Sequence, residues 1–427
     1  MRGMGKGWEQ RQAEIGQRDI GRHVAMNFQQ ACEARDLPGV VLLASDATGK
    51  FKYERAFGLK SAGEKIDVND TFIMASCTKL MTSIAALQCV ERGQIQLDHD
   101  VSTVLTELKD IQILTGFKKG TKEPTFKLAK NKITLRHLLT HSSGIGYYGM
   151  NPILTRLYRT LGAKAAGGAG DPIIKRITVP LLFEPGTSWE YGLGLDWVGV
   201  LVMRLTNMSL EAYMQKNIWD PLGIKNITFH QELKPEVRRR LVKMAKRGSS
   251  RGVWSLPSTG GEKLEWTDDS LYEDPCADEF GGGGAIGSAV EYLKILTSIC
   301  ASDGKLLTGK MVDEMFTPQL PAGPQRALTI YNDALADAKT FTSRKAGTKL
   351  NHGLGGLLVL SDDETGLKSG TMTWSGLPNL LWSIDRRSGL SLFYAGNLIP
   401  FGDFKSHKMQ QLFEREVYSL ASSASKL

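Results

Sequence analysis

Segments with the character of β-strands lie at both ends of this 427-residue chain, and helical patterns fill the stretch between them. Near the start, residues 40–44 and 51–57 flank the turn residues 45–49, a pattern typical of a β-hairpin. Toward the end, four apolar runs separated by turn residues indicate strands: 354–360, 371–374, 379–385 and 390–396. We therefore expect an α/β (α+β) fold in which the two ends build one antiparallel sheet, flanked by helices and interrupted by a mostly helical lobe.

The length predicts more than one structural unit, because a single hydrophobic core stops growing at about 250–300 residues. Residues 21–110 and 280–427 should form the α/β lobe, and residues 111–279 the inserted, mostly helical lobe. Residues 1–20 are polar and glycine-rich and are expected to be a flexible N-terminal extension. Apolar residues make up 41% of the chain and charged residues 23%, which is typical of a globular protein.

Apolar runs such as 39–44 and 353–360 are far shorter than the roughly 18–20 residues that cross a bilayer, so we expect no membrane segment. The polar N-terminus lacks the apolar block of a signal peptide and predicts an intracellular protein. The five cysteines are odd in number and have no CxxC spacing, so we expect reduced thiols, no disulfide and no metal site.

The formal charge of +8 is modest for this length, but one basic cluster stands out. Its members are Arg238, Arg239, Arg240, Lys243, Lys246, Arg247 and Arg251. We interpret the cluster as a solvated helix face and loop. A docking site for an acidic or phosphate-bearing partner, such as a coenzyme A tail or a carrier protein, remains the alternative. No aromatic residues are interleaved with these charges, which disfavours nucleic-acid binding.

The strongest chemical signal is the tetrad Ser-Cys-Thr-Lys at 76–79, at the start of a helix predicted over residues 75–92. Residues three apart share a helix face, with about 5–6 Å between Cβ atoms, so Lys79 can reach the Ser76 hydroxyl. A serine becomes a nucleophile when a base takes its proton, and a lysine partly removed from water can be that base. Ser-x-x-Lys alone arises by chance about once in 400 residues, so a helix-capping Ser76 with a solvated Lys79 stays open on this motif.

Further motifs follow the tetrad in order. Residues 90–98 read VERGQIQLD and residues 133–144 read ITLRHLLTHSSG. With residues 70–79, they resemble the serine β-lactamase-related superfamily, specifically its class C, esterase and transesterase branch, over residues 25–420. Within this branch, YGLGLDWVG at 191–199 is similar to the lovastatin-type fungal acyltransferases. The resemblance implies a β-lactamase/transpeptidase-like fold.

The resemblance also implies a third catalytic residue, Tyr191, beside Ser76 and Lys79. A lysine cation favours a nearby phenolate, so Tyr191 and Lys79 could share the role of general base for Ser76. Which of the two carries the proton is left open by the sequence. The alternative for Tyr191 is a buried aromatic side chain with a satisfied hydroxyl.

The family's oxyanion hole pairs the backbone N–H of the nucleophile with one on a strand beside the site. We expect the N–H groups of Ser76 and Leu377 to fill these roles, because 374–377 reads Trp-Ser-Gly-Leu and resembles a Trp-Gly-Gly segment of related esterases. Trp374 and Gly376 are then expected to bind substrate. The rival is 368–370, Lys-Ser-Gly, which resembles the Lys-Thr-Gly triad of penicillin-recognising enzymes.

Some positions depart from the family pattern. Leu193 stands where class C β-lactamases carry an asparagine, which argues against β-lactam hydrolysis. His137 and His141 are interpreted as structural, since a lysine–tyrosine site needs no histidine. Cys77 points about 100° around the helix from Ser76, so packing is its expected role.

Residues 425–427 read Ser-Lys-Leu, the peroxisomal address. Ser425, Lys426 and Leu427 therefore predict binding to the peroxisomal import receptor and residence in peroxisomes; otherwise we expect a cytoplasmic protein.

Taken together, the residues and the resemblance predict a serine acyltransferase that moves an acyl group from a thioester or ester to a hydroxyl or amine acceptor, in fungal secondary metabolism. Its partners are small-molecule acyl donors and acceptors, with no resident cofactor, although an acyl-coenzyme A or carrier-protein thioester would suit as donor. Two alternatives remain. One is an esterase, amidase or lactamase that gives the acyl group to water, and the other is a catalytically silent binding protein.

Overall fold

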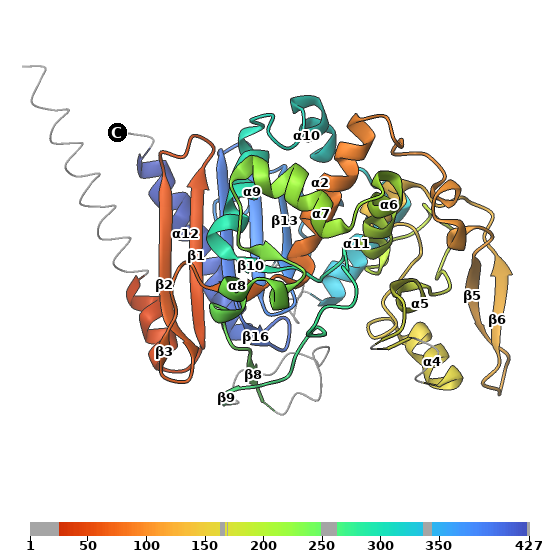
Figure 1. The fold of residues 1–427 in the computed structure, drawn as a ribbon, viewed down its shortest axis with the longest axis horizontal. Coiled ribbons are helices and arrows are strands. Elements are labelled where there is room, and N and C mark those ends of the chain that lie inside the picture. The colour runs from red at the N-terminus through yellow and green to blue at the C-terminus, as the bar shows by residue number, and fades with distance from the viewer. Residues whose placement is uncertain (1–24, 163–166, 169, 249–262, 336–343, 425–427) are drawn as a thin grey trace, which may run out of the picture.

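The computed structural model describes residues 25–162, 167–168, 170–248, 263–335 and 344–424 (Figure 1). Its largest element is an eight-stranded sheet in the order β11-β12-β13-β14-β15-β1-β2-β3, with antiparallel pairing throughout. The strands are β1 (Gly39–Asp46), β2 (Lys52–Ser61), β3 (Glu64–Lys65), β11 (Leu350–His352), β12 (Leu357–Val359), β13 (Thr371–Gly376), β14 (Leu380–Asp385) and β15 (Leu390–Gly396). The two ends of the chain meet where β1 pairs with β15, so the predicted antiparallel sheet built from both ends is confirmed.

The two faces of this sheet are covered by different helices. Neighbouring residues of a strand point to opposite faces. Phe393 of β15 stacks on Tyr292 of α9 (Ala289–Ala301), with ring centroids 4.8 Å apart. The next residue, Tyr394, faces Phe28 of the helix at residues 25–33. Helix α12 (Phe404–Ala424) shares that second face, because its Phe413 ring lies 6.0 Å from Tyr53 of β2.

Helix α2 (Thr78–Glu91) runs through the interior of the molecule. Every residue from Thr78 to Cys89 is buried, so the helix has no solvent face. A helix that is covered all round must pack on several elements, and α2 contacts α6 (Gly194–Thr206) and α7 (Leu210–Met214). This central position fixes the start of α2 within the core.

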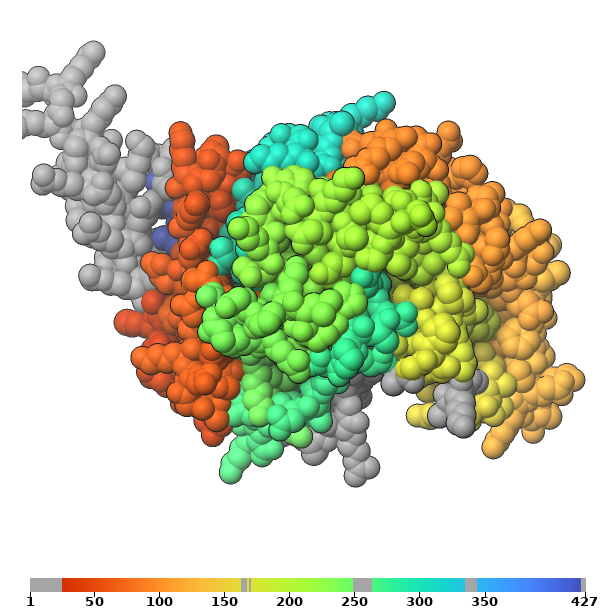
Figure 2. Space-filling model, in the orientation of Figure 1, coloured from red at the N-terminus to blue at the C-terminus, as the bar shows by residue number. Residues whose placement is uncertain are grey.

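The middle of the chain is folded against the large sheet rather than separate from it. In Figure 2 the segments that carry α6 and α7 lie across the front, between the N-terminal strands and residues 112–128. A small sheet in the order β4-β10-β7 joins β4 (Thr71–Ile73), β10 (Ile286–Ser288) and β7 (Ile227–Thr228), so it combines segments from both expected lobes. The division into two lobes at 111 and 279 stays a prediction.

The remaining helices are α3 (Leu135–Leu139), α4 (Pro152–Leu161), α5 (Ile173–Ile177), α8 (Pro235–Arg239), α10 (Gly309–Met315) and α11 (Ala322–Leu335).

One hairpin in the middle segment was not expected from the sequence. Strands β5 (Gln112–Phe117) and β6 (Pro124–Leu128) form a two-stranded sheet, and β5 also bridges to Leu181. Much of β6 is open to solvent, with Leu128 61% exposed, so the hairpin lacks the regular alternation that marks a half-buried strand. A further three-stranded sheet in the order β16-β8-β9 is formed by β16 (Leu398–Ile399), β8 (Ala245–Arg247) and β9 (Leu264–Trp266).

Two sequence predictions fall on residues that the structure does not describe. The N-terminal extension at 1–20 and the tripeptide at 425–427 lie outside the described residues. Within the described part of the chain, no helix combines the length and the apolar character needed to cross a bilayer.

The interpretation of the basic cluster as a solvated surface is wrong for Arg247. Its side chain is 1% exposed, and its Nε donates to Asp403 Oδ2 at 2.6 Å while Nη2 donates to the Asp36 carbonyl at 2.5 Å. Arg239, by contrast, is 65% exposed and pairs with Glu236 at the surface. Arg247 is on β8, and the pairing of β8 with β16 carries it inside, which charge counting along the chain cannot show.

This contrast gives a test of stability. We expect Arg247→Met to lower the free energy of unfolding by about 3–5 kcal/mol, because the Asp403 carboxylate is left buried without its partner. Arg239→Met should change it by less than about 1 kcal/mol, since its ion pair is exposed. Urea denaturation followed by circular dichroism measures both. Equal effects of the two substitutions would contradict a buried role for Arg247.

Candidate active site

Ser76 lies on a tight turn between β4 and α2. Ala75 adopts φ = 44°, a left-handed conformation that costs a non-glycine residue about 1–2 kcal/mol. The short 3-10 turn η1 (Ala75–Cys77) then leads directly into α2. Tyr292 of α9 holds the turn by donating its hydroxyl to the Cys77 carbonyl at 2.8 Å. Ala75 and Cys77 are buried while Ser76 is half-buried, so the turn leaves the Ser76 hydroxyl accessible at the cavity that Ser76 and Ala75 line.

Lys79 is buried, at 3% exposure, and its ammonium group meets three oxygens. Nζ donates to Ser76 Oγ at 3.1 Å, to Tyr147 Oη at 3.1 Å and to the Gly282 carbonyl at 2.5 Å. An ammonium group has three protons and no acceptor, so these partners satisfy all of its donors. The aromatic rings add to this cradle, because Nζ lies 4.9 Å from the centre of the Tyr191 ring. A cation is therefore well accommodated at this buried position.

Tyr191 approaches Ser76 from the segment that precedes α6. The Ser76 and Tyr191 oxygens are 2.6 Å apart, within strong hydrogen-bond distance. The phenol ring is fixed from behind by Trp374 and His141, whose ring centres lie 5.3 and 4.8 Å away. The structure thus brings together the three side chains that the sequence singled out as catalytic, from three separate segments of the chain.

The strand β13 passes behind the Ser76 turn. A Cβ atom on Gly376 would lie 2.7 Å from the Met74 carbonyl and 3.2 Å from Cys77 Sγ, so only glycine lets the strand come this close. Leu377, the next residue, lines the same cavity as Ser76. Ser76 and Leu377 therefore line one cavity, and the use of their N–H groups as an oxyanion hole stays a prediction. Lys368, of the rival motif, lies beyond the opposite end of β13, where it is 41% exposed and pairs with Asp362.

The structure gives Trp374 and Gly376 positions that differ from the expected substrate contacts. Trp374 is 2% exposed and packs against Tyr191, His141 and His352. Among the residues described, neither Trp374 nor Gly376 lines the cavity beside Ser76. Alternation along the strand explains this, because Trp374 and Gly376 point into the packed interior whereas the chain turns toward the cavity at Leu377.

Three groups at this site escaped the sequence analysis. Tyr147 hydrogen-bonds Lys79, and the Gly282 carbonyl does the same. The Gly282 N–H donates to Asp196 Oδ1 at 2.8 Å, so the two backbone groups of one residue link a buried carboxyl to the lysine. The available signals were the position of Tyr147 just after the HSSG motif, the run of glycines at 281–284, and Asp196 within YGLGLDWVG. None of them specifies a partner until the fold brings these segments together.

Burial dominates the titration of the groups around Lys79. It raises the pKa of Asp196, with the nearby Lys79 cation acting in the opposite direction. Burial, followed by the Asp196 charge, raises the pKa of Tyr147 well above 10, so this phenol keeps its proton. Burial also lowers the pKa of His141 well below 6.5 and that of His352 to about 4. Both imidazoles are neutral near pH 7 and serve as packing against Tyr191 and Trp374.

His137 has a different structural role. It caps α3, because its N–H donates to Thr134 Oγ1 while its Nδ1 accepts from the Thr134 N–H.

The cavity beside Ser76 has a volume of about 220 Å³. Its walls are largely apolar, and the lining residues are Ala75, Ser76, Tyr147, Leu193, Asp196, Leu271, Tyr272, Phe280, Gly282, Gly283 and Leu377. The Glu211, His230 and Glu279 side chains elsewhere in the described chain have metal-ligand spacing, but their polar atoms hydrogen-bond one another and their surroundings. We assign no metal there.

Comparison with known proteins agrees with this geometry. Residues 24–412 match the Beta-lactamase family. The chain belongs to the β-lactamase family. It is 34% identical to monacolin J acid methylbutanoyltransferase of Aspergillus terreus, covering 92% of this chain and 94% of that protein. It is 36% identical to the lovastatin esterase of Penicillium rubens, covering 92% and 96%.

Solved structures of the family carry the same architecture. Unliganded simvastatin synthase from Aspergillus terreus, in its selenomethionyl form, superimposes with a TM-score of 0.86 at 32% identity, over 94% of this chain and 98% of that one. The β-lactamase/transpeptidase-like fold is therefore confirmed. By enzyme class, the chain is a serine acyltransferase or esterase of the β-lactamase family.

Tyr147 provides a test of the lysine cradle. Tyr147→Phe removes one of the three oxygens that satisfy Lys79, and a buried charge that loses a hydrogen bond costs about 1–3 kcal/mol. We expect kcat/KM for p-nitrophenyl butyrate to fall by about tenfold or more. Tyr148→Phe is the matched control, because Tyr148 is 42% exposed and should leave the rate unchanged. Equal rates for wild type and Tyr147→Phe would show that Lys79 does not depend on this phenol.

His352 provides a test of pH dependence. The unfolded chain protonates this imidazole below about pH 6.5, whereas the folded protein does so only near pH 4, so its contribution to stability is lost as pH falls from 7 toward 4. We expect wild type to lose about 2 kcal/mol more than His352→Gln between pH 7 and pH 5. Urea unfolding at both pH values measures this. His99→Gln changes an exposed histidine and should lose as much unfolding free energy between pH 7 and pH 5 as wild type does. If His352→Gln also loses as much as wild type, the interpretation of His352 is wrong.

Proposed function

We propose that this protein is a serine acyltransferase that moves an acyl group from a thioester or ester to a hydroxyl or amine acceptor through an acyl-Ser76 intermediate. The observation that carries the proposal is the position of Ser76 Oγ, 2.6 Å from Tyr191 Oη and 3.1 Å from Lys79 Nζ. A hydroxyl held between a tyrosine in its phenolate form and a lysine ammonium group can give its proton to the phenolate, while the ammonium group stabilises the negative charge.

In the acylation step, Ser76 Oγ attacks the carbonyl carbon of the donor, and its proton passes to Tyr191, which enters this step as a phenolate. In this proposal Lys79 acts as an ammonium group that hydrogen-bonds Ser76 Oγ, Tyr147 Oη and the Gly282 carbonyl. The carbonyl oxygen becomes an oxyanion, which the N–H groups of Ser76 and Leu377 stabilise. The intermediate collapses when the carbon–sulfur or carbon–oxygen bond to the leaving group breaks and Tyr191 returns the proton to that group.

In the second step the acceptor takes the place of the leaving group. Its hydroxyl or amine gives a proton to Tyr191 as it attacks the acyl carbon, and the bond to Ser76 Oγ breaks with return of that proton to Ser76. The same side chains thus serve both half-reactions. Water in place of the acceptor gives hydrolysis, so exclusion of water decides between transferase and esterase.

The names of the relatives support transfer to a fungal secondary metabolite. They include the methylbutanoyltransferase above and the acyltransferase calJ of Penicillium decumbens, at 35% identity. Hydrolysis is the second candidate, favoured by the similarity to lovastatin esterase. Leu193 lines the cavity at the position of the β-lactamase asparagine, which argues against a lactam substrate. Acyl-coenzyme A and carrier-protein thioesters both remain proposals as donors, and peroxisomal residence stays a prediction of the sequence.

The decisive experiment detects the acyl-enzyme. Mixed with an acyl N-acetylcysteamine thioester and examined by intact-mass spectrometry, the wild-type protein should gain the mass of one acyl group. Ser76→Ala should gain none. An alcohol or amine is then added to the acyl-enzyme. If it speeds loss of the adduct and becomes acylated, the protein is a transferase. If only the free acid is released, the protein is an esterase. If several thioesters and activated esters leave no adduct on the wild-type protein, the proposal is overturned.

A further inference from the structure

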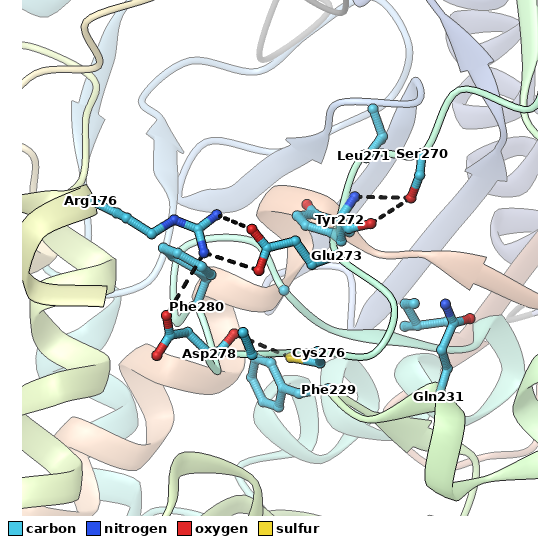
Figure 3. A pocket seen from close by; sticks show the side chains of 13 residues that line it. Arg176, Phe229, Gln231, Ser270, Leu271, Tyr272, Glu273, Cys276, Asp278 and Phe280 are labelled. Carbon is cyan, nitrogen blue, oxygen red and sulfur yellow. Dashed lines mark hydrogen bonds and ion pairs between the residues drawn. The ribbon is translucent and has the colours of Figure 1, made fainter. Parts of the chain in front are cut away.

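A second cavity adjoins the one beside Ser76. It has a volume of about 290 Å³ (Figure 3). Arg176 of α5 lines one side, and the loop before β10, including residues 270–278, lines much of the rest. The two cavities share three lining residues, Leu271, Tyr272 and Phe280. Gly283 lines the Ser76 cavity and Gly284 lines the second one. Side chains of three residues and one stretch of backbone therefore form the wall between the two.

Tyr272 closes this wall on the side of the active site. A Cβ atom placed on Gly283 would lie 3.1 Å from Tyr272 Oη, so the end of the phenol rests against the backbone of that glycine. Burial raises the pKa of Tyr272, with the Asp196 and Tyr191 charges adding to the effect, so the hydroxyl stays neutral. Ser270 fixes the backbone of Tyr272, since its Oγ donates to the Tyr272 carbonyl at 2.5 Å and accepts from the Tyr272 N–H at 3.3 Å.

Arg176 of α5 holds the two flanks of the wall. Its guanidinium group pairs with Glu273 at 3.2 Å and with Asp278 at 3.8 Å, as the dashed lines in Figure 3 show. The same group lies 4.5 Å from the centre of the Phe280 ring. Tyr272 and Phe280 are thereby tied to one anchor on a neighbouring helix.

These ion pairs also decide which ligand suits the second cavity. Its one cation is engaged by two carboxylates, so the cavity offers no unpaired positive charge to a phosphate or a carboxylate. Apolar side chains supply much of the remaining lining, among them Phe229, Leu271 and Ile286. An uncharged hydrocarbon chain fits this lining better than an anion does.

We propose that Tyr272 sets the length of the acyl chain that the enzyme accepts, by separating the acyl cavity at Ser76 from the second cavity, whose apolar side chains can hold the end of a longer chain. This inference rests on the proposed acyl-Ser76 intermediate and goes further, because it names the substrate class as short acyl groups. A chain that grows from Ser76 meets the Tyr272 ring before it can enter the second cavity.

The size of the effect follows from burial of methylene groups. Each buried CH₂ strengthens binding by about fourfold. An octanoyl chain has four more of them than a butyryl chain, so an opened wall has ample scope to change the preference. We expect Tyr272→Ala to raise the ratio of octanoyl to butyryl transfer by at least tenfold.

The experiment is a competition between two thioesters. Butyryl and octanoyl N-acetylcysteamine thioesters are mixed in equal amounts with the full-length protein, and intact-mass spectrometry gives the early ratio of the two Ser76 adducts. Wild type should carry mainly butyryl, and Tyr272→Ala should shift toward octanoyl. Tyr272→Phe is the control, because it keeps the ring and should keep the wild-type ratio within about twofold.

A double variant tests whether the second cavity itself holds the chain. Cys276 lines that cavity, so Cys276→Trp in the Tyr272→Ala background should fill it and restore the butyryl preference. An unchanged ratio in Tyr272→Ala overturns the inference, and so does a shifted ratio that Cys276→Trp leaves in place. If Tyr272→Ala does not fold, Tyr272→Leu is used with the same two outcomes. Absence of any adduct on wild type would instead overturn the proposed function.

Discussion

The buried ammonium group of Lys79 is the constraint on which the rest of the site depends. A cation with 3% exposure is tolerated only when its hydrogen bonds are made within the protein. Its three partners come from the Ser76 turn, from Tyr147 and from the glycine run at 281–284, segments that are far apart in the sequence. Satisfying one charge therefore fixes three pieces of backbone around the nucleophile.

The same constraint extends to residues that hold the partners of Lys79 in place. The Gly282 carbonyl accepts from Lys79, and the N–H of the same residue donates to Asp196. A Cβ atom on Gly282 would lie 2.4 Å from Asp196 Oδ2, so this close approach requires glycine. Gly376 has a similar role on the opposite side, where it lets β13 lie against the Ser76 turn. Glycines at contact points, more than flexible loops, place the backbone around Ser76.

Much of the fold could be predicted because local patterns and long-range structure agree. The hairpin 40–57, the helix at 75–92 and the C-terminal strands have the period and the turn residues of their final states. The exceptions have physical reasons. Strand β6 carries little burial to create a pattern. Arg247 is buried through the pairing of β8 with β16, whose partners Ala245 and Leu398 lie in distant parts of the chain.

By itself, the sequence determined which side chains are available for chemistry: a serine and a lysine one helical turn apart, and a tyrosine within a recognisable motif. Helical spacing favours the first pairing, since residues three apart meet on one face, and the 3-10 turn that carries Ser76 leads directly into α2. Only the tertiary structure decided what surrounds them. Tyr147, Asp196 and Gly282 become partners of the site, and Tyr272 becomes the wall of its cavity, because burial and hydrogen bonding across the folded core act between residues that have no relation along the chain.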